Sequence, residues 1–409
     1  MLRNKVLKNF FNLAGVQLAL TVLQLLLYPY MVKVIGDDRY GQVILMQSYA
    51  LLLQVLVIFG TDLGAIRSIS KQSNSKKRLE YIFLTVFEGR LIIAFFMCIL
   101  YLIGINIWDV DLAYCFYIFT ILEAAFTTKW FFHGLQKLQY YTIPFVLGKS
   151  ITIILLFLFI KKNQDWDLYP LIFSLTSFMV CLISFFIAKV KYSINAKKIK
   201  FKIIVKRFLN SKDLFLTNVI STVKDRTAII FIAHIIGDKY VVYYDFAYKV
   251  SDMLSSLLSS FSASLYPSFV ADFKVEKFEM YYKIIFVVSI IPLIILSLFS
   301  NEIIQLIDII IGLNLEPIQS IYWLFGSIIF VRGFGYYIGL CYLMVKGQSK
   351  LYSRSLILSG VTYILAMSFI VILDLNGLVY ISIGVFVSLS IELIDRFLMY
   401  KKIRNEYEF

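Results

Sequence analysis

Charged residues interrupt several long apolar segments of this chain. The stretch ISTVKDRTAIIFIAHIIGD, residues 220–238, carries Lys224, Asp225 and Arg226 side by side. Charges at membrane depth are costly, so they ordinarily pair with one another or line a water-filled path. At about 100° per residue, a helix here would turn Asp225 to the middle of a polar face roughly 200° wide, with Lys224 and Arg226 at its two edges. This pattern predicts one wall of a wet cavity that binds a charged ligand.

The next apolar segment carries charges at helical spacing. Asp245, Lys249 and Asp252 follow i, i+4, i+7 and therefore share one face of a helix. Counting deep charges in the other segments gives a predicted substrate cavity of Arg90, Lys149, Lys224, Asp225, Arg226, Lys249 and Arg332. The acidic residues predicted to balance charge or to couple transport to an ion are Glu123, Asp225, Asp245 and Asp252. The uncharged polar residues predicted to line the same cavity are Gln17, Gln24, Gln47, Gln54 and Asn218.

For any one of these residues, the alternative to lining a cavity is to pair with a polar side chain and so hold two helices together. Lys249 has Asp245 and Asp252 within reach on its own face, and a lone Gln or Ser in a membrane helix commonly makes a packing hydrogen bond. Pairing explains poorly why polar stripes occur on at least four segments drawn from both halves of the chain. That abundance predicts a central hydrophilic cavity. Because Lys and Arg bind phosphates well, the six deep cations predict an anionic guest such as a phosphate or pyrophosphate.

The elements that would position these residues are membrane-spanning helices. The chain has 409 residues, of which 60% are hydrophobic and only 16% charged, whereas soluble domains are about 25% charged. A spanning helix needs about 20 apolar residues. Twelve segments meet this requirement: 9–35, 40–66, 79–103, 112–135, 140–160, 167–188, 208–236, 240–270, 279–300, 318–345, 352–373 and 376–400. The predicted fold class is an all-α polytopic membrane protein whose helices form two six-helix bundles around a central hydrophilic cavity.

The net charge of +14 is explained by where the basic residues lie. With the N-terminus inside, the inner connections hold 27 Lys and Arg, and the outer connections hold five. By the positive-inside rule, both termini are predicted to be cytoplasmic. The basic balance is then a topology signal with some contact to anionic lipid headgroups, and no nucleic-acid partner is expected.

The longest polar connection falls near the middle of the chain. We predict an N-terminal bundle over 1–188, a basic cytoplasmic linker over 189–207 and a C-terminal bundle over 208–409. Six spans in each half means that both halves enter the membrane from the same side, as in parallel transporter repeats. A shared Ile-Gly-Asp turn, VIGDDRYGQ at 34–42 and IIGDKYVVYY at 235–244, indicates such a repeat weakly.

Cysteine and histidine usage indicates neither a metal site nor an enzyme. Four cysteines lie far apart in apolar segments, without zinc-type spacing, and the two histidines have no triad partners nearby. We therefore expect no metal, no cofactor and no catalytic residues. No cleavable signal peptide is evident, since the basic start runs directly into a long span.

Several stretches resemble one family of membrane proteins. These are LKNFFNLAGVQL, LYPYMVKVIGDDRYGQV and VIFGTDLGAIRSIS in the first half, and KDRTAIIFIAHIIGDKYVVYYDFAYKVSDML with LYPSFV in the second. They are similar to the polysaccharide-transport (Wzx-type) flippases, which belong to the same MOP superfamily as MATE drug exporters and the lipid II flippase. The resemblance covers the whole chain, although its motifs are loose turn residues that carry no substrate specificity. Asp225 with Arg226 matches an Asp-Arg-type pair that is frequent in this helix of the family.

The resemblance implies a function. Such proteins move an undecaprenyl-diphosphate-linked oligosaccharide, an O-antigen or capsule precursor, from the cytoplasmic to the outer leaflet of the bacterial inner membrane. They work by alternating access through a cationic cavity, with or without coupling to an ion gradient. The implied partners are that lipid-linked oligosaccharide, membrane lipids and other polysaccharide-assembly proteins such as a polymerase.

Two alternatives stay open. A MATE-type exporter of organic cations would need a net acidic cavity with an aromatic cage, whereas six deep cations here face five deep acidic residues. A membrane polysaccharide polymerase or glycosyltransferase would carry a sizeable outer loop with residues for chemistry. The longest connection here is cytoplasmic and rich in lysine, so this alternative ranks last.

Overall fold

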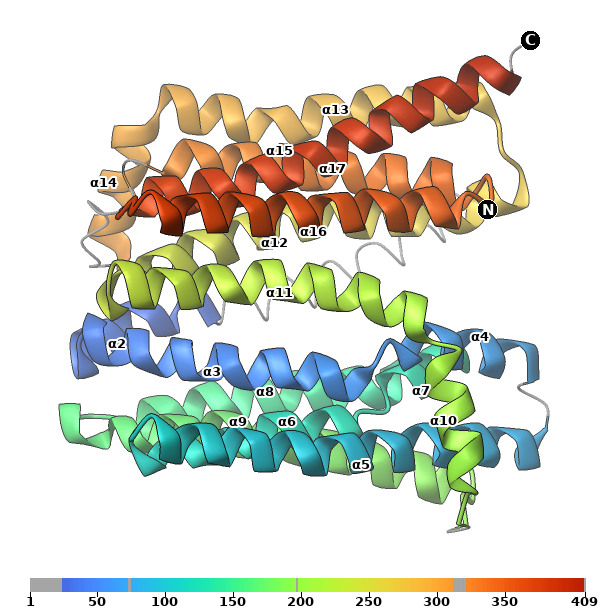
Figure 1. Ribbon diagram of the computed structural model, residues 1–409, viewed down its shortest axis with the longest axis horizontal. Coiled ribbons are helices and arrows are strands. Elements are labelled where there is room, and N and C mark those ends of the chain that lie inside the picture. The colour runs from blue at the N-terminus through green and yellow to red at the C-terminus, as the bar shows by residue number, and fades with distance from the viewer. Residues whose placement is uncertain (1–23, 73–74, 196–197, 312–318, 320, 408–409) are drawn as a thin grey trace. The chain divides into compact units, whose positions relative to one another are not determined.

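The structure is a computed structural model that describes residues 24–72, 75–195, 198–311, 319 and 321–407. Within these ranges, every regular element is a helix (Figure 1). The chain forms two compact units, one of Val34–Thr227 and the other of Met1–Lys33 with Ala228–Phe409. The predicted bundles, 1–188 and 208–409, divide the sequence at a different place from these units, and they stay a prediction.

The unit of Val34–Thr227 is built on antiparallel helices with aromatic packing. Its elements are α3 (Asp37–Ile58), α4 (Thr61–Gln72), α5 (Lys76–Ile107), η1 (Leu112–Tyr117), α6 (Ile118–Phe126), α7 (Lys129–Gly134), α8 (Gln139–Phe159), η2 (Asn163–Asp167), α9 (Leu168–Lys191) and α10 (Phe201–Leu209). Helix α6 packs on α3, α5 and α9, and α8 packs on α9. Phe83, Trp130 and Phe131 lie at the centre of a buried cluster, which fixes α5 against α7.

The second unit places α15 among several neighbours. Its elements are α12 (Asp238–Ala271), α13 (Val275–Leu298), α14 (Ser300–Ile311), α15 (Tyr322–Tyr337), the π-helix η4 (Ile338–Met344), α16 (Ser349–Ile372) and α17 (Leu378–Tyr407). Helix α15 packs on α12, α13 and α17, and α16 packs on α17. The ring of Phe278 stacks on Tyr337 at 5.0 Å between ring centroids. Two helices cross the boundary between the units, α2 (Leu27–Ile35) and α11 (Lys212–Ile235).

Eight of the predicted spans have a matching long helix in the described part of the chain, although the span 40–66 ends early, because α3 ends at Ile58 and α4 begins at Thr61. Eight segments among the described residues are long and apolar enough to cross a membrane. Of the other four predicted spans, 9–35 lies largely outside the described residues, and 112–135 is broken into η1, α6 and α7. The remaining two are α11 and α12, which interrupt their apolar sequence with charges. The all-α membrane architecture is therefore confirmed, while the count of twelve stays a prediction.

The two Ile-Gly-Asp turns have the same local structure. Gly36 precedes α3 with φ 83° and ψ 157°, and Gly237 precedes α12 with φ 128° and ψ 158°. This region of backbone conformation is open essentially to glycine alone. In both turns, the backbone N–H of a tyrosine donates back to the glycine carbonyl, Tyr40 to Gly36 and Tyr240 to Gly237. The sequence similarity of the turns thus extends to their backbone.

The basic connection between α9 and α11 is fixed to its own unit. The carboxylates of Glu80 and Glu88 on α5 accept hydrogen bonds from the backbone N–H groups of Asn195 and Ile199, at 3.0 and 3.3 Å. Helix α10 crosses α5 (Figure 1) at Gly89, where a Cβ atom would lie 2.3 Å from the ring of Phe208. The predicted linker therefore contains a packed helix.

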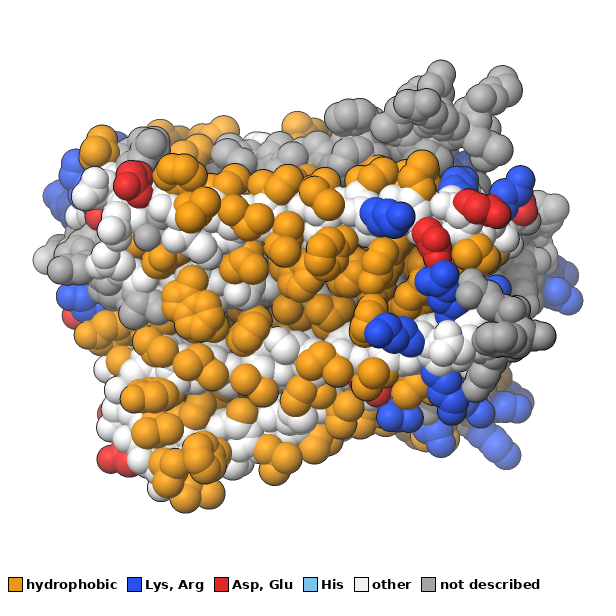
Figure 2. Space-filling view, turned by 90° about the horizontal axis from the view of Figure 1, so that it is seen from above, with side chains coloured by type: hydrophobic (Ala, Val, Ile, Leu, Met, Phe, Trp, Pro, Cys, Tyr) orange, Lys and Arg blue, Asp and Glu red, His pale blue; other side chains and the backbone are white. Residues whose placement is uncertain are grey.

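Apolar side chains cover the outside of the helices. Phe95 and Phe96 on α5 are 62% and 59% exposed, and α13 shows similar outward residues. Figure 2 shows one face of the molecule, on which hydrophobic side chains fill most of the length while Lys and Arg gather towards one end. A lipid-facing belt bounded by basic residues is the arrangement expected of a membrane protein.

Candidate functional site

The charged stretch of α11 separates into one buried and two accessible side chains. Lys224 is 4% exposed, whereas Asp225 and Arg226 are partly exposed. The side chain of Asn218, predicted to lie on the same polar face, falls outside the described part of the structure. A cation and a carboxylate thus stay accessible on the predicted polar face of α11, as expected for a polar path.

Asp245 forms a buried charge network with two side chains. Its Oδ2 accepts a hydrogen bond from Lys249 Nζ at 2.7 Å and another from the hydroxyl of Tyr28 on α2. Lys249 Nζ also donates to the Tyr28 hydroxyl oxygen at 2.6 Å. Asp245 is 1% exposed and the Lys249 side chain is 28% exposed. The pairing expected as an alternative for Lys249 is present here, and it joins α12 to α2.

Arg332 on α15 is the centre of a more open network. Its Nη1 lies 3.1 Å from Oδ1 of Asp252, and its Nη2 donates to the hydroxyl of Tyr248. The guanidinium also stands over the Tyr248 ring, 5.0 Å from its centroid. The side chains of Arg332 and Asp252 are 19% and 56% exposed. A charged pair that stays accessible on spanning helices has to face water or a polar ligand.

Arg90 on α5 is enclosed by protein. It is 0% exposed, its Nε and Nη2 donate to Thr61 Oγ1 at 3.0 and 2.7 Å, and its Nη1 donates to the carbonyl of Ala124 at 3.3 Å. Nη2 also forms an ion pair with Asp62. The predicted cavity cation Arg90 therefore holds α4, α5 and α6 together in this conformation.

The other predicted residues of this unit make interhelical contacts. Lys149 Nζ donates to Ser177 Oγ at 2.7 Å and lies 4.5 Å from the ring centroid of Phe173. Gln54 Nε2 donates to the carbonyl of Thr120 at 3.0 Å, which is a packing hydrogen bond between α3 and α6. Glu123 accepts a weak hydrogen bond from the thiol of Cys181. Gln47, and Gln24 of the other unit, are partly buried. Gln17 lies outside the described residues.

Sequence reasoning missed a second buried arginine network, on α17. Arg396 is 3% exposed, lies 2.7 Å from Oε1 of Glu392, and donates to Ser355 Oγ and to the carbonyl of Gly335, each at 3.0 Å. The i, i+4 spacing of Glu392 and Arg396 inside the last predicted span was the signal that could have found it. Like Arg90, it joins three helices.

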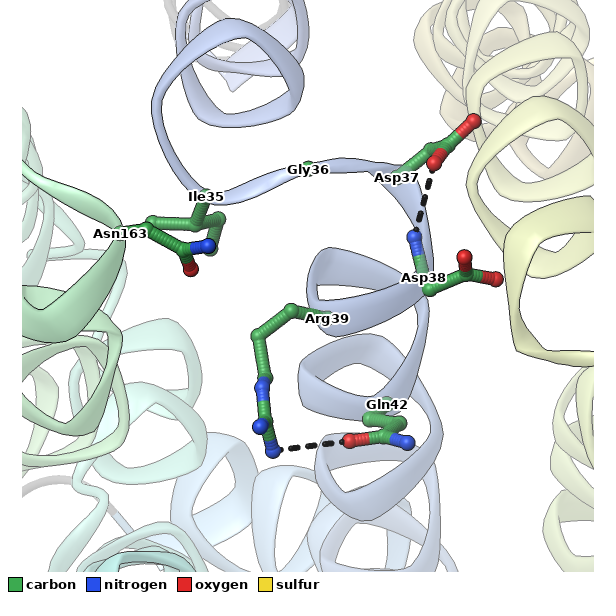
Figure 3. A pocket seen from close by; sticks show the side chains of 7 residues that line it. All are labelled: Ile35, Gly36, Asp37, Asp38, Arg39, Gln42 and Asn163. Atoms are coloured by element: carbon green, nitrogen blue, oxygen red, sulfur yellow. Dashed lines mark hydrogen bonds between the residues drawn. The ribbon is translucent and has the colours of Figure 1, made fainter.

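A polar pocket lies at the turn before α3. It has a volume of about 340 Å³ and is lined by Ile35, Gly36, Asp37, Asp38, Arg39, Gln42 and Asn163 (Figure 3). Arg39 Nη1 donates to Gln42 Oε1 at 3.1 Å, and its guanidinium stands 4.5 Å from the ring centroid of Trp166. None of these residues is in the predicted set. Carboxylates, amides and a guanidinium around one open pocket suit a ligand rich in hydroxyl groups.

The described residues contain no group of three or more His, Cys, Asp or Glu side chains arranged to hold a metal ion. The accessible charges are instead Asp225 and Arg226 on α11 and, in the other unit, Asp252 on α12 with Arg332 on α15. Such an arrangement can bind a polar or anionic solute.

Sequence comparison identifies a family. A profile described as polysaccharide biosynthesis protein matches residues 6–273. The chain is 21% identical over 271 residues to a protein named "Putative O-antigen transporter" from Escherichia coli (strain K12), and 22% identical over 264 residues to a protein of the same name from Shigella dysenteriae. The first alignment covers 64% of this chain and 64% of the relative, so it spans just under two thirds of the relative's length.

Structural comparison identifies the fold. An inward-facing multidrug-resistance MATE transporter of the MOP superfamily matches with a TM-score of 0.70 and 15% identity, covering 96% of this chain and 98% of the other. The lipid II flippase MurJ in an inward closed conformation matches with a TM-score of 0.70 and 14% identity, covering 97% and 87%. At these identities the likeness concerns the fold. The chain is therefore a multi-pass membrane protein with the MOP superfamily fold, and it belongs to the polysaccharide biosynthesis protein family.

Proposed function

We propose that this protein is a flippase for a lipid-linked oligosaccharide. It carries an undecaprenyl-diphosphate-linked repeat unit, an O-antigen or capsule precursor, from the cytoplasmic to the outer leaflet of the bacterial inner membrane by alternating access. Family membership and the names of the two O-antigen transporter relatives support this class of cargo. The fold shared with a lipid flippase and with solute exporters supports transport by a moving helical bundle.

The observation that carries the proposal is the accessible network of Arg332, Asp252 and Tyr248. An arginine and an aspartate that remain 19% and 56% exposed on spanning helices require a polar neighbour, because lipid would leave them poorly solvated. A guanidinium next to a tyrosine ring offers donors to a phosphate and an aromatic face to a sugar. Arg226 and Asp225 on α11 offer a second accessible pair of charges.

The test is replacement of Arg332 by Gln in cells whose only copy of the gene is the variant. The Arg332 side chain is partly exposed and its partner Asp252 is 56% exposed, so water can replace the lost contact and the protein should reach the membrane in normal amounts. We expect surface polysaccharide to fall about tenfold or more, since loss of one charge-assisted hydrogen bond removes about 1.5–3 kcal/mol. The matched control is Lys274→Gln, which removes the same charge from an exposed ion pair with Asp272.

Two further measurements separate the alternatives. The replacement Arg226→Gln, at the accessible cation of α11, should also reduce surface polysaccharide with membrane insertion unchanged. Adding Lys224→Gln removes a buried lysine and should lower stability as well. A cation exporter would instead lose resistance to organic cations and keep its surface glycan. Normal surface polysaccharide in the Arg332→Gln cells, at normal membrane levels of the protein, would contradict the proposed role.

A further inference from the structure

A second pocket, unconnected with the predicted site residues, lies between α13 and α17. It has a volume of about 700 Å³, and its lining includes Glu279, Tyr282 and Lys283 from α13 with Tyr400, Lys401 and Arg404 from α17. These residues belong to one compact unit. The pocket lies near the first residues of α13 and the last residues of α17, where the two helices reach the same end of the unit (Figure 1).

The charge of this pocket is positive after internal pairing. Arg404 Nη2 lies 2.7 Å from Oε1 of Glu279, so the single lining carboxylate is already matched by a guanidinium. Lys283 and Lys401 are exposed. Neither has a carboxylate within ion-pair distance among the residues that the structure describes. The ammonium groups of Lys283 and Lys401 can therefore bind an anion from outside the chain.

The base of the pocket is aromatic and rigid. The rings of Tyr282 and Tyr400 stack at 5.7 Å between centroids, and Tyr400 is only 6% exposed. Arg404 Nη1 donates to the Tyr400 hydroxyl at 3.3 Å, and Lys401 Nζ stands 4.7 Å from the ring centroid of Phe397. These contacts hold two of the cations in place before any ligand arrives, which lowers the entropy lost on binding.

An apolar surface continues from the pocket along the helices. On α13 the outward residues Ile284, Val287 and Ile291 are 44%, 54% and 43% exposed, and on α17 Ile394 and Leu398 are 55% and 56% exposed. Helix α13 is a candidate membrane span with 11% of its apolar window buried inside the protein. A ligand that fits both regions has an anionic head and hydrocarbon chains.

We propose that this pocket binds the phosphate headgroup of an anionic lipid, with its acyl chains lying along α13. The positive-inside prediction places the pocket at the cytoplasmic leaflet, whose anionic lipids are attracted by clustered Lys and Arg side chains. The bulk source of such a headgroup is membrane phospholipid. The phosphate of the isoprenoid carrier lipid offers the same chemistry. This binding does not depend on the proposed cargo.

The test is lipid binding to the purified full-length protein in detergent, followed by native mass spectrometry. Phosphatidylglycerol is titrated against phosphatidylcholine of the same chains, and the apparent Kd of the first bound lipid is measured. We expect phosphatidylglycerol to bind the wild type about tenfold more tightly than phosphatidylcholine. The double variant Lys283→Gln and Lys401→Gln should lose about tenfold in affinity for phosphatidylglycerol and should change little for phosphatidylcholine.

The matched control is Lys350→Gln with Lys402→Gln. Both lysines are exposed, neither lines the pocket, and Lys402 directly follows Lys401 on α17. This control removes the same charge from the same predicted side of the membrane and should bind phosphatidylglycerol as the wild type does. An equal loss in the control, or unchanged phosphatidylglycerol affinity in the pocket variant, overturns the proposal.

Competition identifies the source of the headgroup. Undecaprenyl phosphate added at the same concentration either displaces phosphatidylglycerol, which assigns the pocket to the carrier lipid, or leaves it bound, which assigns the pocket to membrane phospholipid. Both results support a phosphate-headgroup site, provided the pocket variant loses the lipid that wins. Surface polysaccharide, measured separately, reports on the proposed flippase function and not on this binding.

Discussion

Arg90 and Arg332 were both predicted as cavity cations, yet their surroundings differ. Each is paired with an aspartate and hydrogen-bonded to a hydroxyl group, Arg90 to Asp62 and Thr61, Arg332 to Asp252 and Tyr248. The Arg90 side chain is 0% exposed and the Arg332 side chain is 19% exposed. The same residue type in the same kind of segment thus serves as an interhelical clamp in one unit and as an accessible charge in the other.

The difference shows that depth alone does not identify a binding residue. A deep arginine whose donors all point at protein atoms contributes to stability, and its loss leaves a buried carboxylate or carbonyl without a partner. A deep arginine with an open edge keeps part of its hydrogen-bonding capacity for a ligand. The accessible surface of each charged group therefore separates charges that stabilise the fold from charges that can bind a ligand. It also predicts the order in which substitutions should lower the free energy of unfolding.

The largest effect is expected for Arg90→Met. Removing the guanidinium leaves the buried Thr61 hydroxyl and Ala124 carbonyl without their donor, while the Asp62 carboxylate, 37% exposed, is hydrated. We expect a cost of about 3 kcal/mol in total, since each buried polar group left unpaired costs about 1–3 kcal/mol. The free energy of unfolding, measured by titration of mixed micelles with SDS and followed by circular dichroism, should fall by that amount. If the free energy of unfolding fell by less than about 1 kcal/mol and transport were lost, Arg90 would be a substrate-binding residue, as the sequence predicted.

Asp245→Asn should have an intermediate effect. The carboxylate is 1% exposed, while its partner Lys249 is 28% exposed and can recover some hydration. Loss of two charge-assisted hydrogen bonds, partly replaced by the amide oxygen, should lower the free energy of unfolding by about 2 kcal/mol. The same SDS titration measures it, with Tyr28→Phe as the smaller control. Equal losses in the two variants would mean that the tyrosine, rather than the charge pair, dominates the contact between α2 and α12.

Arg332→Gln should change stability least among the charged variants. Asp252 is 56% exposed, so water replaces much of the lost interaction, and the free energy of unfolding should fall by about 1 kcal/mol or less. Transport, assayed as surface polysaccharide, should nevertheless fall strongly. If the variant instead lost several kcal/mol of stability and a matching share of protein from the membrane, Arg332 would act as a stabilising residue, as Arg90 does.

Gln54→Leu gives the smallest expected effect. Its single hydrogen bond to the Thr120 carbonyl joins α3 to α6, and interhelical hydrogen bonds in membranes average about 0.6 kcal/mol. Unfolding should therefore shift by no more than that, and surface polysaccharide should stay normal. Transport lost at normal stability would place Gln54 on the solute path, as its position in the polar stripe predicted.

The helices were predictable because apolar length is a local property. The span 79–103 corresponds to α5, and 352–373 corresponds to α16. The break of 112–135 into three helices was missed, since the segment contains no proline and its apolar residues are long enough in total to span a membrane. The family was also predictable, because several stretches of the sequence resemble it and the family profile matches residues 6–273.

The partners of charges on different helices were not predictable, whereas the i, i+4 pair of Asp245 and Lys249 was. Asp62 lies 28 residues before Arg90 on another helix, and no local spacing links the two residues. Arg396 was not predicted although Glu392 lies one turn away, because it lies near the end of the predicted span 376–400 and not at its middle. Helical arithmetic placed Lys224 at the edge of a polar face, but its burial depends on tertiary contacts that a single helix does not reveal.

Helix α10 has a consequence for how this unit sits in a bilayer. Phe201 and Leu209 are 65% and 60% exposed, Lys202 and Lys206 are exposed beside them, and Ile204 and Phe208 pack inward. A short helix with apolar and basic residues on its outer surface favours the boundary between headgroups and acyl chains. Because α10 is fixed to α5 at Gly89, this preference is passed to the rest of the unit. Helix α10 therefore draws the part of α5 around Gly89 towards the membrane interface, which brings the neighbouring Arg90 nearer to the headgroups than the predicted span 79–103 places it.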